Sequence, residues 1–203
     1  MKHKVIGLVF SAIVATVSVH TYAFGLGDLT AATGGGGASS VSAKDLLSLY
    51  VGSDVMVTSG QIKLLNAVGL KDKAASLEAK AKNLTSGATS ESLEDTATEQ
   101  TSANKALQDK LTSDKTPLTA EGKKQFSAGL IDLAKGVTGY VTMASSVSKY
   151  KPGMSDIGAA ASSVIYIIKS LPATTDNLTN TLKNAIAYAK ENKIDVPKEA
   201  SAF

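Results

Sequence analysis

The 203-residue chain carries a formal net charge of +3, has no cysteine, tryptophan or arginine, and has two histidines, His3 and His20. If its first 23 residues are removed, no histidine remains. This composition excludes Ser-His-Asp and Cys-His catalysis, zinc sites built from Cys or His, and disulfides. It also argues against a nucleic-acid partner, because the lysines are scattered and arginine is absent.

Residues 1–23 have the pattern of a secretory signal peptide. Lys2 and Lys4 precede an uncharged apolar stretch, and Thr21-Tyr22-Ala23 supplies small residues at the −3 and −1 positions of a cleavage site. We therefore expect export to the periplasm or the medium, with cleavage after Ala23. Residues 24–41, with glycines at 34–37, are predicted to be a flexible segment. They are not a phosphate loop, since no Gly-Lys-Ser/Thr ending is present.

Helical periodicity begins at residue 42. Ser42 and Asp45 have capping-box spacing before a predicted helix Ala43–Val68, in which Gly52 and Gly60 favour a bend or a break. A short helix over Leu70–Leu84, or a continuation of the first, is expected next.

A third helix is predicted over Glu91–Ser113. Four acids crowd its first turns: Glu91, Glu94, Asp95 and Glu99. Acids at a helix N-terminus are favoured by the helix dipole. The alternative is a cation site, but the spacing of a calcium-binding loop is missing.

Thr119 is the predicted cap of the next helix, whose apolar residues alternate in steps of four and three as in a coiled coil. Gly122, Gly129, Gly136 and Gly139 share one face beside this stripe. We predict that they permit close approach of another helix within the chain. The alternative is small-residue packing in a membrane.

An apolar helix from Asp156 to Leu171 is predicted to lie centrally. Its uncharged run of 12 residues, 157–168, is shorter than the roughly 20 that span a membrane. Pro172 is expected to kink or break the chain before a last helix. Residues 195–203 are expected to form a frayed C-terminal tail. The candidate residues for contact with a membrane or partner are Ile157, Val164, Ile165 and Ile168.

Several single residues are assigned to ordinary structural roles. Asp132 is expected in a surface ion pair, with Lys135 nearest in sequence, and Lys169 is expected to extend outward. Tyr140, Tyr166 and Tyr188 are assigned to the core with their hydroxyls reaching the surface; lining a ligand cavity is the alternative.

Together these patterns predict an all-α, up-and-down bundle of four to five helices over residues 42–194. We expect an exported, non-enzymatic protein that binds another protein or an envelope component, with no cofactor and no metal. One alternative is a membrane-active or lipid-binding bundle. Another is a hydrolase that uses a Ser-Lys or carboxylate pair.

Overall fold

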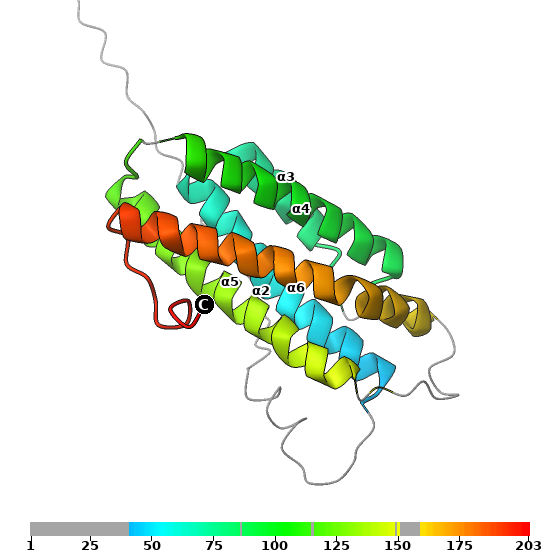
Figure 1. Cartoon of the computed structure of the whole chain (residues 1–203). Helices are drawn as coiled ribbons and strands as arrows, with labels where there is room; N and C mark the ends of the chain where they lie inside the picture. The colour runs from blue at the N-terminus through cyan, green and yellow to red at the C-terminus, as the bar shows by residue number, and fades with distance from the viewer. Residues whose placement is uncertain (1–40, 86, 115, 149, 151–158) are drawn as a thin grey trace, which may run out of the picture. The chain divides into compact units, whose positions relative to one another are not determined.

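The computed structural model describes residues 41–203, apart from residues 86, 115, 149 and 151–158. This part of the chain contains five helices packed against one another and no strand, so the predicted all-α fold is confirmed. The helices are α2 (Ala43–Ala67), α3 (Lys71–Ala81), α4 (Ser90–Ser113), α5 (Ala120–Val147) and α6 (Ala159–Glu191) (Figure 1). The predicted signal peptide and almost all of the Gly-rich segment lie outside the described residues.

Capping side chains fix the start of three helices. The Ser42 hydroxyl accepts from the Asp45 backbone N–H at 3.2 Å, and the Asp45 carboxylate accepts from the Ser42 N–H at 3.2 Å, which completes the predicted capping box. Thr89 and Thr119 cap α4 and α5 with their hydroxyls. These caps satisfy backbone donors that have no partner inside the helix.

Side-chain contacts between helices show their directions. Gly60 faces Leu133 and Val57 faces Gly136, so α2 and α5 are antiparallel. Asp54 bonds to Gln100, and Gln61 bonds to Asn104 further along both helices, so α2 and α4 run the same way. The short α3 lies between them in sequence and runs in the opposite direction, which returns the chain to the start of α4. The described helices therefore alternate in direction along the chain.

Glycines bring α2 and α5 unusually close together. A Cβ atom on Gly60 would lie 2.5 Å from the Leu133 nitrogen, and one on Gly139 would lie 2.2 Å from the Ser53 Oγ. Both distances are shorter than side chains tolerate, so only glycine permits this approach. The expected break at Gly52 or Gly60 does not occur, because α2 is one helix from Ala43 to Ala67.

Pro172 lies inside α6 and does not end it, so the predicted separate last helix is wrong. A proline removes one backbone hydrogen bond and costs about 3 kcal/mol in a helix interior. Each large apolar side chain that is buried returns about 1.5–3 kcal/mol. Side chains on both sides of the proline are buried in the same core, so the free energy gained by their burial exceeds the cost of the proline and the helix continues. These side chains are Val164, Ile167, Leu171, Leu178 and Leu182.

The C-terminal segment is ordered against the bundle and is not frayed as expected. Ile194 and Ala200 are buried, and Val196 and Phe203 pack partly against the core. The Ala200 and Ser201 N–H groups both bond to the Pro197 carbonyl at 3.0 Å, which closes a turn.

None of the helices described here combines the length and apolarity that a membrane span requires.

The close α2–α5 contact predicts the effect of adding one methyl group. In Gly136→Ala the new Cβ would lie 2.6 Å from Val57 Cγ2 and 2.7 Å from the Val57 nitrogen. Because backbone atoms cannot move aside as a flexible side chain can, we expect the free energy of unfolding to fall by about 1–3 kcal/mol. Urea denaturation measures this loss.

Gly52→Ala is the matched control, since no heavy atom lies within 4 Å of the position of its Cβ. Alanine is the better helix former there, so the free energy of unfolding should stay level or rise by up to about 1 kcal/mol. Equal losses in the two variants would contradict a special role for the α2–α5 contact.

Candidate functional site

A carboxylate lies at the centre of the bundle. Asp54 of α2 is 1% exposed. Its Oδ1 accepts a hydrogen bond from the Tyr140 hydroxyl of α5 at 2.6 Å and another from Gln100 Nε2 of α4 at 2.7 Å. The same Gln100 nitrogen donates to the Thr58 hydroxyl at 2.8 Å. One acceptor oxygen thus joins three helices.

The buried hydrogen bonds continue from Asp54 toward the α4–α6 interface. Gln61 of α2 donates to the Gln100 carbonyl at 3.4 Å and to Asn104 Oδ1 at 2.6 Å. Asn104 Nδ2 donates to Asn177 Oδ1 of α6 at 3.1 Å. We call the following set the polar seam: Asp54, Thr58, Gln61, Gln100, Asn104, Tyr140 and Asn177.

Among the described residues, Asp54 is surrounded by hydrogen-bond donors but by no opposite charge. Burial raises the pKa of Asp54 to about 6, although the hydrogen bonds from Tyr140 and Gln100 act in the other direction. Burial also raises the pKa of Tyr140, and the Asp54 charge adds to this effect. The Tyr50 ring packs edge-on against the Tyr140 ring, with centroids 5.3 Å apart.

Two polar atoms near the polar seam are buried without a well-formed hydrogen bond. The Tyr50 hydroxyl lies near the side chains of Tyr140 and Ser170 but bonds to neither with ordinary geometry. The Gln61 Oε1 atom is likewise unpartnered. Such groups cost free energy, so the seam is held together less well than an apolar core of the same size.

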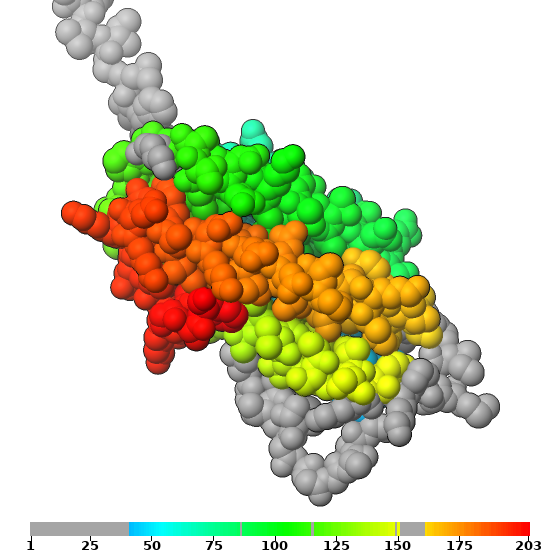
Figure 2. All heavy atoms as spheres, viewed as in Figure 1, coloured from blue at the N-terminus to red at the C-terminus, as the bar shows by residue number. Residues whose placement is uncertain are grey.

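The polar seam ends at two hollows between α4 and α6. The first is a cavity of about 30 Å³ beside Gln100, Asn104 and Asn177, which has space for a water molecule. The second is an open groove of about 530 Å³. Five neutral polar side chains line this carboxamide groove: Gln108, Asn177, Asn180, Thr181 and Asn184. Figure 2 shows α4 and α6 side by side on the face toward the viewer.

Asp132 is paired across the α2–α5 contact and not with Lys135. Its carboxylate accepts from the Ser59 hydroxyl at 2.7 Å and forms a short ion pair with Lys63. The side chains of Lys63 and Asp132 are 34% and 18% exposed, so water still reaches the pair. This contact connects two helices and leaves no carboxylate available for chemistry.

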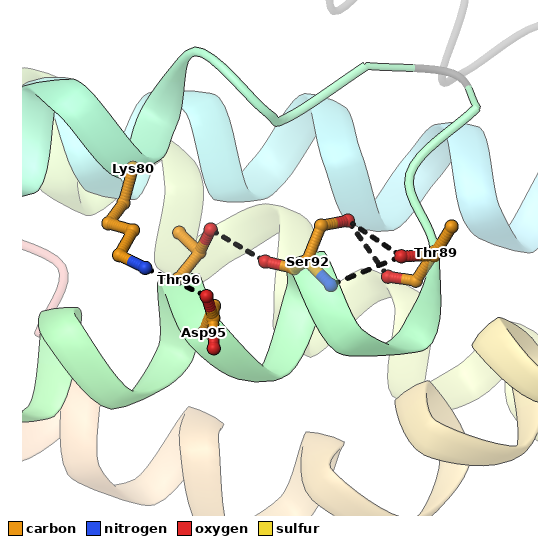
Figure 3. Close-up of polar contacts among 5 residues, drawn as sticks. All are labelled: Lys80, Thr89, Ser92, Asp95 and Thr96. Carbon is orange, nitrogen blue, oxygen red and sulfur yellow. Dashed lines mark hydrogen bonds and ion pairs between the residues drawn. The ribbon is translucent and has the colours of Figure 1, made fainter.

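Two of the four acids in the first turns of α4 contact lysines of α3. Asp95 accepts from Lys80 Nζ at 2.7 Å, next to the Thr89 cap and its bond from the Ser92 N–H (Figure 3). Glu99 lies 3.8 Å from Lys73 Nζ. Among the described residues no group of three or more His, Cys, Asp or Glu side chains has the geometry to hold a metal ion.

A serine and a lysine do meet between α3 and α4. Lys73 Nζ donates to Ser102 Oγ at 2.9 Å. Ser102 lies in the middle of α4, where backbone N–H groups are already used by the helix. Acyl transfer needs free donors for the developing oxyanion, and a helix interior supplies none. The contact therefore does not form a nucleophilic site.

The candidate contact residues of α6 occupy different environments. Val164 is 1% exposed and belongs to the core, so it cannot contact a partner in this fold. Ile165 is 53% exposed, and Ile168 packs partly against the core. Ile157 lies outside the described residues. Lys169 is exposed and extends outward, as expected.

Two of the three tyrosines, Tyr140 and Tyr188, are buried in the core as predicted. Tyr140 is fully buried, and its hydroxyl reaches Asp54 and not the surface. Tyr188 packs against Phe126 with ring centroids 5.4 Å apart, and Tyr166 is half-buried. Asp54 was not predicted from the sequence, although its position four residues after Tyr50 puts both on one helix face.

The polar seam predicts a cost for removing its central donor. Gln100→Ala leaves Asp54 with one hydrogen bond fewer and deprives Thr58 of a donor. We expect the free energy of unfolding to fall by about 1–3 kcal/mol, as measured by urea denaturation. Gln108→Ala is the control on the same helix, where the side chain is exposed, and it should change stability by less than about 0.5 kcal/mol. Similar losses in both variants would contradict the role of the seam.

No family model, curated protein or solved structure matches this chain.

Proposed function

We propose that this protein is an exported, non-enzymatic bundle that binds an envelope component in the carboxamide groove between α4 and α6. The observation that carries this proposal is the lining of the groove. None of its five side chains is charged or apolar, and four of them are carboxamides. Such a surface discriminates by hydrogen bonding, because it offers a ligand neither a counter-ion nor apolar burial.

The chemistry of the groove favours a neutral, hydroxyl-rich ligand. Each carboxamide carries a donor and an acceptor side by side. The Thr181 hydroxyl donates to the Asn177 backbone carbonyl at 3.0 Å, so it offers a ligand an acceptor only. Adjacent hydroxyls of a sugar chain carry the complementary pairs. Asn177 is held in place by Asn104 on the opposite helix, so part of the groove is arranged before a ligand arrives. We therefore assign the groove to a neutral oligosaccharide segment of the envelope.

A lipid-binding function is the second candidate, and one observation favours it. Ile165 and Val141 are the large apolar side chains that are most exposed in the described part of the chain, at 53% and 50%. Exposed apolar side chains bind a bilayer only when several act together. Flotation of the protein with liposomes of zwitterionic and anionic phospholipid distinguishes this candidate from the groove.

Binding in the groove predicts a selective loss. We expect neutral hexasaccharides to shift the side-chain amide NMR signals of Asn180 and Asn184. The double variant Asn180→Ala/Asn184→Ala should bind roughly 10- to 50-fold more weakly, since two hydrogen bonds of about 1 kcal/mol each are lost. Titration of the same sugars by calorimetry gives the dissociation constants.

Asn83→Ala is the control for this experiment, because Asn83 is an exposed carboxamide that does not line the groove. Its affinity should equal that of the unchanged protein. Equal binding of an acidic hexasaccharide, or no shift at the groove with any sugar, would contradict the proposal. A protein captured by a photo-crosslinker at position 184, with no sugar bound, would assign the groove to a protein partner.

If the protein is exported, its signal peptide is removed, and this predicts which residue forms the new N-terminus. We expect the exported form to begin at Phe24, because Ala23 ends the small-residue pattern of the cleavage site. N-terminal sequencing of protein recovered from the periplasm or the medium checks this. Replacing Ala23 with a bulky residue such as Tyr should leave the precursor uncleaved. An intact Met1 on the exported protein would contradict the proposal.

A further inference from the structure

Asp54 is bonded in a way that lets its carboxyl group gain a proton without losing a partner. Both the Tyr140 hydroxyl and the Gln100 amide donate to the same oxygen, Oδ1. A protonated carboxyl group keeps its carbonyl oxygen as an acceptor and carries the proton on the other oxygen. Protonation therefore removes the buried charge while both hydrogen bonds remain.

Within the part of the chain that the structure describes, no positive charge compensates Asp54 when it is ionised. The titratable groups that face it are Tyr50 on its own helix, Tyr140 on α5 and Tyr166 on α6. The helix α4 presents the neutral Gln100, and within the described residues no charged side chain of α3 or α4 acts on the carboxyl group. An ionised carboxylate in this position gains from access to water.

The side of Asp54 covered by α4 is the weakest side of its enclosure. By contrast, α5 is held by the glycine contacts with α2 and by large apolar side chains. The inner face of α4 is polar in its middle, at Thr96, Gln100 and Asn104. The 30 Å³ cavity also lies beside Gln100. A movement of α4 thus exposes Asp54 at a lower cost in apolar burial than a movement of α5.

We propose that Asp54 and Gln100 form a proton-dependent clasp, which holds α4 on the bundle tightly when Asp54 is neutral and loosely when Asp54 is ionised. The device goes beyond the proposed binding function, because it depends on the interior of the bundle and not on a ligand. It makes the attachment of one helix responsive to pH while the α2–α5 pair stays closed.

The sign of the effect follows from the direction of the pKa shift. The pKa of Asp54 is raised to about 6 in the folded protein from 3.8. Below about pH 4 the group is neutral whether α4 is closed or open, so it imposes no cost. The cost grows between about pH 4 and pH 6 and is complete above that range. Acid therefore closes the clasp, and neutral or alkaline solution loosens it.

Hydrogen exchange of the full chain tests the clasp. After correction for intrinsic exchange rates, we expect the opening constant of the α4 amides near Gln100 to be about tenfold larger at about pH 8 than at about pH 5. The α5 amides at 136–139, which face α2, should change much less. In Asp54→Asn, which keeps a neutral acceptor oxygen, the ratio for α4 should fall close to one.

Asp109→Asn is the matched control, since Asp109 is an exposed acid on α4, the helix whose exchange is measured. This variant should keep the tenfold ratio. Equal loosening of all helices, or an unchanged ratio in Asp54→Asn, would overturn the proposal. If Asp54→Asn does not fold, the proposal is tested on the unchanged protein by comparing two pH midpoints. The pH midpoint of α4 opening must then match the midpoint of a buried aspartate carboxyl followed by carbon-13 NMR, and different midpoints would overturn the clasp.

Discussion

The close contact between α2 and α5 is the constraint on which the other interactions depend. Glycines at 60, 129, 136 and 139 let the two backbones approach to a distance at which an added Cβ would overlap its neighbour. This approach sets the reach of Tyr140, which follows Gly139 directly and bonds to Asp54 across the interface. With α5 further away, the Asp54 carboxylate would be buried with fewer donors, at a cost of several kcal/mol. Tight packing of α5 against α2 therefore permits a polar centre at Asp54, where Gln100 of α4 also reaches α2.

Different interactions attach α5 and α4 to α2. α2 and α5 are joined mainly by apolar burial and backbone proximity, which change little with pH, and in addition by the Lys63–Asp132 ion pair and the Tyr140–Asp54 hydrogen bond. α4 is joined by apolar residues toward its ends, Leu93 and Leu107 among them, and by directed hydrogen bonds in its middle. Hydrogen bonds depend on geometry and on charge, so a small change at Asp54 alters the attachment of α4 more than that of α5. Composition along one helix face thus determines which helix moves first.

The helices were predictable because they depend on local patterns. The cap at Ser42 and the periodicity after it gave α2 to within one residue of its end, and Thr119 gave the start of α5. The predicted break at Pro172 was wrong because the free energy that a proline costs locally is smaller than the free energy gained by burial on both sides of it. That burial depends on contacts with other helices, which a local pattern does not show. Asp54 and Gln61 were missed for a related reason. They fill the gaps in the stripe Tyr50, Val57 and Leu64, but a search for apolar residues passes over polar ones in core positions.

The groove and the clasp share α4, which connects the binding proposal with the pH response. A ligand held by Gln108 on α4 and by Asn180 or Asn184 on α6 bridges the two helices, so it favours the state in which α4 is closed. Protonation of Asp54 favours the same state. By thermodynamic reciprocity, a ligand that binds the closed state raises the proton affinity of Asp54, and acid raises the affinity for that ligand by the same factor. Asn104 and Asn177 form the physical link, because their hydrogen bond joins the polar seam to the groove.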